Sequence, residues 1–235
     1  MISNDSRDRI KGVFEPIALA LGRLGLSPDA LTIVGFAITV FGAVLLAQEQ
    51  WLAGGLVVLV GGVFDMLDGT LARVTGRVSR WGAFLDSTLD KTGEIVVYLG
   101  IIAGLQSVGI ADGPLLAAAA LGASLMVSYT RARSEGLGFT TGAGMAAIGI
   151  MPREVRLAVL SVGLILAGIL GTRPYFVDGS SGAGGMAVPI GASVLFLALG
   201  IIAVGATLTT IQRILHVRSQ ANQPATGRPT EQEYP

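Results

Sequence analysis

The sequence lacks cysteine and contains a single histidine among its 235 residues. Without cysteine the chain has no disulfide scaffold, no thiolate nucleophile and no zinc site with cysteine ligands. One histidine also excludes a histidine-rich metal site. Charged residues make up only 14% of the chain, against roughly 25% in a typical soluble domain. The 16 basic and 16 acidic residues cancel, so no global positive field attracts nucleic acid and we expect no nucleic-acid partner.

What the sequence has instead is small apolar residues, with 51% hydrophobic positions and 34 glycines. Such residues let membrane helices approach closely, and a span needs about 20 mostly apolar residues. The predicted fold class is therefore an all-α integral membrane protein with six transmembrane helices. The six expected spans are 31–49, 51–71, 82–106, 113–130, 154–171 and 187–211.

A different pattern precedes the first span. Apolar residues recur there at spacings of three and four, with basic residues between them, and this spacing predicts an amphipathic juxtamembrane helix. A surface helix packed on the bundle remains an equal alternative. The apolar positions are Ile10, Val13, Phe14, Ile17, Leu21 and Leu24. We thus expect an amphipathic segment at 1–27, a membrane domain at 28–216, and a polar, disordered tail at 217–235.

The distribution of positive charge predicts the topology. Of the 16 Lys and Arg residues, only Arg173 lies in a connection on the other side of the predicted bundle. The positive-inside rule then places both termini in the cytoplasm, for a protein of the inner cell membrane. The glycine-rich stretch 178–185 is expected to be an external loop.

Four aspartates lie inside two adjacent apolar segments, where carboxylates are costly and usually functional. Asp65 and Asp68 are three residues apart, and Asp86 and Asp90 are four apart, so each pair shares one helix face. Because the connecting loop is short, we expect the two helices to be antiparallel neighbours with facing carboxylates. Oxygen ligands alone favour Mg²⁺ or Mn²⁺, and also suit Ca²⁺. Four carboxylates can hold two such ions about 4 Å apart, as in phosphoryl transfer.

The stretch from Asp65 to Asp90 resembles the motif of the CDP-alcohol phosphotransferases, D-x2-D-G-x2-A-R-x8-G-x3-D-x3-D, without a departure. The matching positions are Asp65, Asp68, Gly69, Ala72, Arg73, Gly82, Asp86 and Asp90. The resemblance implies an enzyme that moves a phosphatidyl group from CDP-diacylglycerol to an alcohol and releases CMP.

The same resemblance implies roles for individual residues. Asp65, Asp68 and Asp86 would bind two Mg²⁺ ions, with Mn²⁺ as a substitute, and Asp90 would lie at their edge as the general base. From the residues alone, Asp86 and Asp90 are equally plausible bases. The positions expected to bind the CDP-lipid are Asp29, Ala30, Leu31, Thr32, Gly69, Ala72, Arg73, Ser79 and Gly82. Residues 27–29 also have the sequence of a helix N-cap followed by proline, which is the alternative for this segment.

A second group of residues is basic and bears on the acceptor alcohol. Guanidinium groups at three neighbouring helix ends suit a phosphate on the acceptor, although anchoring at the membrane surface would also explain them. They are Arg131, Arg153, Arg156 and Arg213. The layout is most similar to that of the prokaryotic phosphatidylinositol phosphate synthases, which implies inositol 1-phosphate as acceptor. Phosphatidylglycerol phosphate synthesis from glycerol 3-phosphate is the alternative.

A transporter is the alternative of another class, but its charges would favour the bilayer midplane. Glu94, one turn beyond Asp90, is expected either to pair with a basic residue or to order the acceptor pocket. The resemblance also implies a homodimer in contact with membrane lipids.

Overall fold

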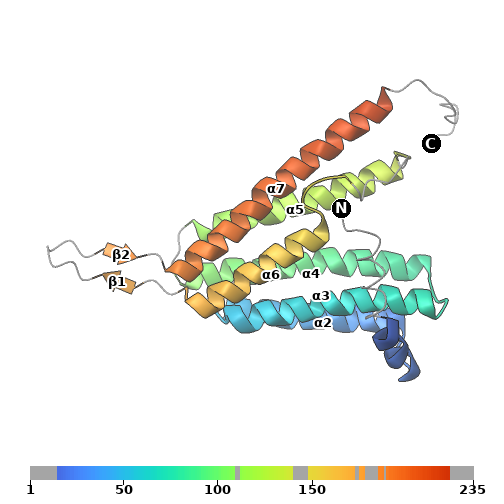
Figure 1. The fold of residues 1–235 in the computed structure, drawn as a ribbon, viewed down its shortest axis with the longest axis horizontal. Coiled ribbons are helices and arrows are strands. Elements are labelled where there is room, and N and C mark those ends of the chain that lie inside the picture. The colour runs from blue at the N-terminus through green and yellow to red at the C-terminus, as the bar shows by residue number, and fades with distance from the viewer. Residues whose placement is uncertain are drawn as a thin grey trace.

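The computed structural model describes residues 15–108, 112–139, 148–172, 175–177, 185–187 and 189–222. Within these ranges six long helices form an elongated bundle (Figure 1). They are α2 (Pro28–Ala47), α3 (Trp51–Val74), α4 (Arg80–Ser107), α5 (Gly113–Gly136), α6 (Arg153–Leu170) and α7 (Ile190–Ala221). Residues 15–23 form a further helical segment before α2.

A short antiparallel hairpin lies at the end of the bundle opposite to the start of α2 and the end of α7 (Figure 1). Strand β1 (Tyr175–Val177) pairs with β2 (Gly185–Ala187) so that Tyr175 is opposite Ala187. The predicted loop at 178–185 is therefore shorter at its C-terminal end, because Gly185 begins a strand. Its remaining residues lie outside the described part of the chain.

Local sequence accounts for where α2 and α4 begin. Ser27 is the N-cap of α2, and its hydroxyl accepts a hydrogen bond from the Ala30 amide at 3.1 Å, with Pro28 in the first turn. Ser79 caps α4 in the same way and accepts from the Gly82 amide at 2.9 Å. Between α3 and α4, Gly76 has a φ of 65°, which a residue with a Cβ rarely adopts. These caps satisfy amides that a helix start leaves without partners.

The packing order of the helices differs from the one expected. Helix α2 packs against both α3 and α4, whereas α3 and α4 share few contacts with each other. On the other side, α3 packs on α6, α6 on α7, α7 on α5, and α5 on α4. The prediction of α3 and α4 as direct neighbours was therefore wrong over most of their length. A short loop fixes only where two helices meet, and here α2 lies between them beyond that point.

Glycines let α2 and α4 come into close contact. A Cβ on Gly100 would meet the main-chain carbonyl of Ala43, and one on Gly104 would meet that of Leu46. Large side chains fill the space beside these contacts, with Tyr98 and Ile101 fully buried. The abundance of glycine in the sequence therefore has a packing cause, as in other membrane bundles.

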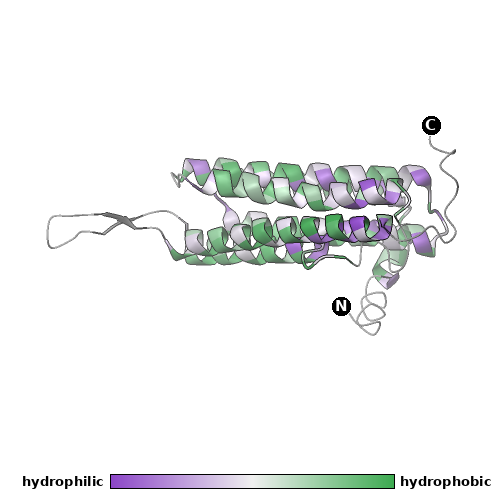
Figure 2. Ribbon diagram, turned by 90° about the horizontal axis from the view of Figure 1, so that it is seen from above, coloured by the Kyte–Doolittle hydropathy of each residue, from purple (hydrophilic) through white to green (hydrophobic). Residues whose placement is uncertain are grey.

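Four of the six helices are long and apolar enough to cross a membrane, namely α2, α3, α5 and α7. Helices α4 and α6 carry charged residues over the stretch that would have to span. Large apolar side chains such as Phe41, Leu56 and Leu197 are exposed on the outside of the bundle. Hydrophilic residues gather mainly at the end where α2 begins (Figure 2). The fold is thus a helical bundle with an apolar outer face.

The helical segment at 15–23 lies against the polar end of the bundle. Ala18 is fully buried and Leu21 packs with it against Leu67 and Leu71 of α3, while Ile17 and Leu24 are exposed. Ile10, Val13 and Phe14 lie outside the described residues. At the other terminus, α7 continues beyond the expected end at 211, because no helix-breaking residue occurs before Ala221. Residues 217–221 are therefore helical and do not belong to the expected disordered tail.

We expect Gly100→Ala to destabilise the protein, because the added methyl group overlaps the backbone of Ala43. Overpacking of this kind costs about 1–3 kcal/mol. Gly122→Ala is the matched control, since no atom lies within 4 Å of a Cβ at this helical position. Thermal unfolding in detergent should show a lower melting temperature for Gly100→Ala only. Equal melting temperatures would contradict the packing described for α2 and α4.

Candidate active site

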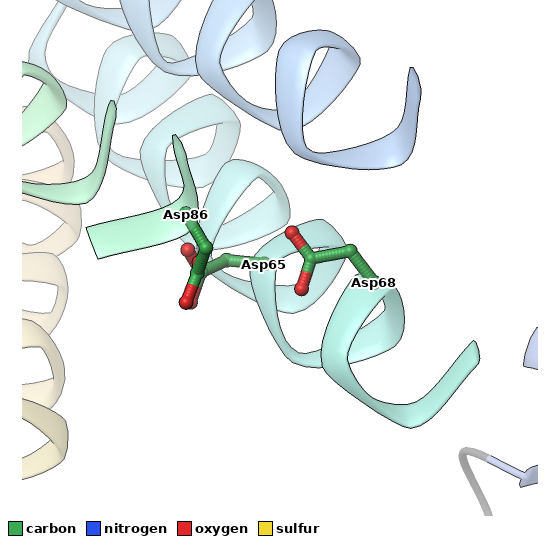
Figure 3. Close-up of side chains that lie close together, drawn as sticks. All are labelled: Asp65, Asp68 and Asp86. Carbon is green, nitrogen blue, oxygen red and sulfur yellow. The ribbon is translucent and has the colours of Figure 1, made fainter. Parts of the chain in front are cut away.

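Three aspartates converge at the polar end of the bundle (Figure 3). Asp65 and Asp68 come from α3 and Asp86 from α4, and one carboxylate oxygen of each lies within 4.8 Å of the others. Asp68 is only 4% exposed. The predicted meeting of the two acidic pairs is thus found for three of the four aspartates.

Helix α2 holds this cluster in place. The Thr32 hydroxyl donates a hydrogen bond of 2.6 Å to Oδ2 of Asp68. Asp29, one turn earlier in α2, lies close to the first turn of α4, because a Cβ on Gly82 would be 3.2 Å from its Oδ1 and 3.1 Å from Oγ of Ser79. The segment around residues 29–32 therefore supplies both a helix start and polar groups beside the carboxylates.

The other positions expected to bind the CDP-lipid are distributed differently. Leu31 is 1% exposed and packs into the small core with Leu67 and Leu71, so its side chain does not face the carboxylates. Ala30 donates its amide to the N-cap of α2. Arg73 is one turn beyond Gly69 and donates to Thr70 at 3.3 Å. A Cβ on Gly69 would meet only the Arg73 guanidinium, which leaves open space beside the helix. Ala72 is half-buried on the same turn.

Asp90 lies outside the group of three aspartates and is engaged by two cations. Its Oδ2 is 2.8 Å from Nζ of Lys91, and its Oδ1 forms an ion pair with Nη2 of Arg153. The other end of the same guanidinium, Nη1, lies 2.8 Å from Oδ2 of Asp65. Arg153, expected among the acceptor arginines, thus also links Asp65 of the acidic group to Asp90 outside it. Sequence spacing could not indicate this contact, because it joins residues of α3, α4 and α6.

Charge balance at the site indicates an affinity for cations. In the described part of the chain neither Asp68 nor Asp86 forms an ion pair with a basic side chain, because Arg153 pairs with Asp65 and Asp90 instead, and both lie beside Asp65. Carboxylates this close in a partly dry site repel one another unless cations neutralise them. Three oxygen donors within reach of one another suit Mg²⁺ or Mn²⁺. The residues present therefore fit a divalent cation held by Asp65, Asp68 and Asp86.

A cavity of about 810 Å³ adjoins the acidic group on the side of α5, α6 and α7. All four predicted acceptor arginines line it, together with Asp86 and Asp90. They are Arg131, Arg153, Arg156 and Arg213. The structure thus brings together side chains from three helices that the sequence could only place at one end of the membrane.

The arginines of this cavity differ in their partners. Arg213 is 3% exposed, and its donors contact two main-chain carbonyls, those of Ile148 at 3.1 Å and of Val127. Arg156 is equally buried and pairs with Glu94 at 3.4 Å. Arg131 is half-exposed and pairs with Glu135 at 2.9 Å. A buried cation held by carbonyls rather than by a carboxylate is a favourable partner for an anion.

A smaller cavity of about 90 Å³ lies between α2, α3, α4 and α6. Asp65 and Asp90 line its polar part, and Val97 and Leu160 line its apolar part. Glu94 lines this smaller cavity and Lys91 lines the larger one, and the two side chains form an ion pair of 3.0 Å. Lys91 was not among the expected site residues, although its place beside Asp90 and three residues before Glu94 is a signal that the sequence carries.

The whole chain is similar to known proteins. The family model described as CDP-alcohol phosphatidyltransferase matches residues 26–222. The chain is 35% identical to the phosphatidylinositol phosphate synthase of Streptomyces avermitilis over 225 residues, which cover 94% of this chain and 84% of that protein. It is 36% identical over 156 residues to the archaetidylinositol phosphate synthase of Pyrococcus horikoshii, with 66% of this chain and 78% of that protein covered.

The solved structures similar to this chain include those of another phosphatidylinositol phosphate synthase. The crystal structure of Mycobacterium tuberculosis phosphatidylinositol phosphate synthase (PgsA1) with CDP-DAG bound has a TM-score of 0.70 and 29% identity, and covers 92% of this chain and 98% of that chain. The same enzyme in complex with manganese and citrate has a TM-score of 0.71 and 28% identity, with 94% and 98% covered. Both similarities extend over nearly the whole bundle.

We expect Asp68→Asn to abolish most of the thermal stabilisation that Mn²⁺ gives the detergent-solubilised protein, because the buried member of the cluster loses its charge. A ligand at about 100 times its Kd stabilises a folded protein by about 2.7 kcal/mol. Asp112→Asn, at the start of α5 and at the far end of the bundle, is the matched control. Melting curves with and without Mn²⁺ measure the effect. Full stabilisation of Asp68→Asn would contradict a cation site at the three aspartates.

Proposed function

This chain belongs to the CDP-alcohol phosphatidyltransferase family, and we propose that it transfers a phosphatidyl group from CDP-diacylglycerol to inositol 1-phosphate, releasing CMP. It is a multi-pass membrane protein and a phosphotransferase, so the transporter alternative falls away. The observation that carries the choice of acceptor is the cavity of about 810 Å³, in which two buried arginines lie beside the acidic group. The named synthases among its relatives favour inositol phosphate over glycerol 3-phosphate.

On the donor side, Asp65, Asp68 and Asp86 would hold Mg²⁺ or Mn²⁺. With Asp90 as a further ligand at the edge of the group, the site would hold two such ions. A divalent cation bound there supplies positive charge to the diphosphate of the CDP-lipid. The related enzyme solved with manganese supports this choice of metal. The remaining donor-side contacts are proposed for Asp29, Ala30, Leu31, Thr32, Gly69, Ala72, Arg73, Ser79 and Gly82. The side chain of Leu31 is in the core and its amide donates to the Ser27 carbonyl at 3.1 Å, so any contact of Leu31 with the lipid would be through its main chain.

On the acceptor side, the guanidinium groups of the large cavity would bind the phosphate of the alcohol. Arg213 is the strongest candidate, because it is buried and the main chain holds two of its donors in place. Arg156 and Arg131 add charge from α6 and α5. Arg153, between the acidic group and the cavity, would contact the substrates where they meet.

Asp90 is proposed as the general base because it lines both cavities. Its ionised carboxylate, which Lys91 and Arg153 contact, is the form that accepts a proton. Asp90 takes the proton of the acceptor hydroxyl, and the oxygen attacks the phosphorus that carries the lipid. The bond from this phosphorus to the CMP oxygen breaks, and CMP leaves with the electron pair.

The membrane placement is proposed from charge and length. Six spans would place the site and both termini on the cytoplasmic side of the inner cell membrane. Apolar side chains of α4 and α6, such as Leu99 and Ile169, are exposed on the outside of the bundle like those of the other helices. The N-terminal segment 1–27 would lie along the membrane surface, followed by the membrane domain 28–216 and the tail 217–235. A homodimer in the lipid bilayer is also proposed.

The test of this function is CMP release by the purified protein with Mg²⁺ and CDP-diacylglycerol. We expect release with inositol 1-phosphate, and none with free inositol or serine, which lack the phosphate that the arginines bind. Release only with glycerol 3-phosphate would keep the mechanism and overturn the acceptor. No release with any of these alcohols would contradict the proposed reaction.

We expect Arg213→Gln to raise the KM for inositol 1-phosphate by roughly 10- to 100-fold, the loss associated with a charge-assisted hydrogen bond. The KM for CDP-diacylglycerol should stay nearly constant, because Arg213 lines only the larger of the two cavities. Arg218→Gln, on the exposed side of the same helix, is the matched control. Steady-state kinetics with each substrate varied in turn separates the two constants. Equal changes in both would argue against a phosphate site at Arg213.

A further inference from the structure

Glu94 links two cations that line the larger cavity. It lies one turn after Asp90 in α4, and its side chain is 16% exposed. Oε2 of Glu94 is 3.0 Å from Nζ of Lys91, and Oε1 is 3.4 Å from Nη2 of Arg156. Each carboxylate oxygen therefore holds a different cation, one from its own helix and one from α6.

Lys91 connects Glu94 with the proposed base. Its Nζ lies 2.8 Å from Oδ2 of Asp90 as well as 3.0 Å from Glu94. A lysine held between two carboxylates has a defined position, although its long side chain carries much rotamer entropy. Without Glu94, Asp90 alone would hold this ammonium group among the described residues, and its position would be less restricted.

Arg156 depends on Glu94 more strongly. Nη1 of Arg156 donates to the carbonyl of Met151 at 3.2 Å, and the Met151 amide in turn donates to Thr209 of α7 at 2.9 Å. Glu94 is the carboxylate paired with this guanidinium in the described part of the chain, and Nε has no partner there. A buried guanidinium that loses its carboxylate moves toward other acceptors or toward water.

These contacts form one path across the bundle, from Thr209 through Met151, Arg156, Glu94 and Lys91 to Asp90. Arg156 and Asp90 line both cavities, while Glu94 lines the smaller one and Lys91 the larger. Glu94 thus does not itself border the cavity proposed for the acceptor, but it restrains two cations that do. A planar guanidinium binds phosphate well only in the correct orientation.

We infer that Glu94 is a positioning residue for the acceptor, which orients Arg156 toward the acceptor phosphate and keeps Lys91 beside Asp90. This inference rests on the proposed function, because it requires the acceptor to bind in the larger cavity. The loss of an ordinary structural ion pair would lower stability, and it would not raise the KM for one substrate more than the KM for the other.

The test is Glu94→Gln, which keeps the shape of the side chain and removes its charge. The KM for inositol 1-phosphate should rise about tenfold, as expected for one charge-assisted hydrogen bond. The KM for CDP-diacylglycerol should stay within about twofold. Glu94→Asp keeps the charge and should recover part of the acceptor affinity. Glu49→Gln, at the opposite end of the bundle, is the matched control and should leave both constants unchanged.

A double-mutant cycle identifies the residue through which Glu94 acts. If Glu94 orients Arg156, then Glu94→Gln should change the acceptor KM little once Arg156→Gln is present. Additive effects in the cycle, or equal increases in both KM values for Glu94→Gln, would overturn the inference. Should Arg156→Gln fail to fold, two results still test the inference. They are the larger rise of the acceptor KM than of the CDP-diacylglycerol KM in Glu94→Gln, and the partial recovery of acceptor affinity in Glu94→Asp.

The wild-type protein separates this inference from the proposed function. If it releases CMP with glycerol 3-phosphate instead of inositol 1-phosphate, the proposed acceptor is wrong, and the same comparison with glycerol 3-phosphate tests Glu94. If neither inositol 1-phosphate nor glycerol 3-phosphate supports CMP release, the protein does not use a phosphorylated acceptor, and both proposals are overturned.

Discussion

Repulsion among carboxylates that are held together at the polar end of an apolar bundle is the constraint on which the other features of this structure depend. Asp65, Asp68 and Asp86 lie within reach of a common ligand, and such an arrangement is unfavourable without compensating cations. The protein supplies part of the compensation, through Arg153 on Asp65 and the Thr32 hydroxyl on Asp68. The remaining negative charge is what makes the site suited to a divalent cation, and a rigid helical support is what keeps the carboxylates from moving apart.

The helix packing provides this support. Helix α2 lies against both α3 and α4, and glycines such as Gly100 allow the backbones to touch. A close backbone contact leaves little freedom for sliding or rotation, so the register between the two acidic helices is set by α2 rather than by the short loop that joins them. Small residues thus help to keep a highly charged site in place, because they allow the close packing that holds the acidic helices together.

Positive charge in the same region is organised by a second set of contacts. Arg156 and Arg213 are buried, and main-chain carbonyls and Glu94 hold them rather than solvent. Asp86, Asp90 and Arg153 line the large cavity on the side where it meets the acidic group. A cation-seeking site and an anion-seeking site therefore lie side by side, as a reaction between a diphosphate and a phosphorylated alcohol would require. Membership of the CDP-alcohol phosphatidyltransferase family agrees with a site that has one acidic part and one basic part.

The sequence by itself determined the class of the protein, the approximate limits of its helices and the identity of the acidic group. These features depend on local composition and on periodicity, which fix the face of a helix on which Asp65 and Asp68 or Asp86 and Asp90 lie. Only the tertiary structure decided that α2 separates α3 from α4, that Leu31 belongs to the core, and that Arg153 reaches Asp65 and Asp90. It also decided which arginines are buried, since Arg131 and Arg213 look alike in the sequence. The physical reason is that an ion pair between helices depends on their rotation and register, and these are set by the packing of side chains far apart in the chain.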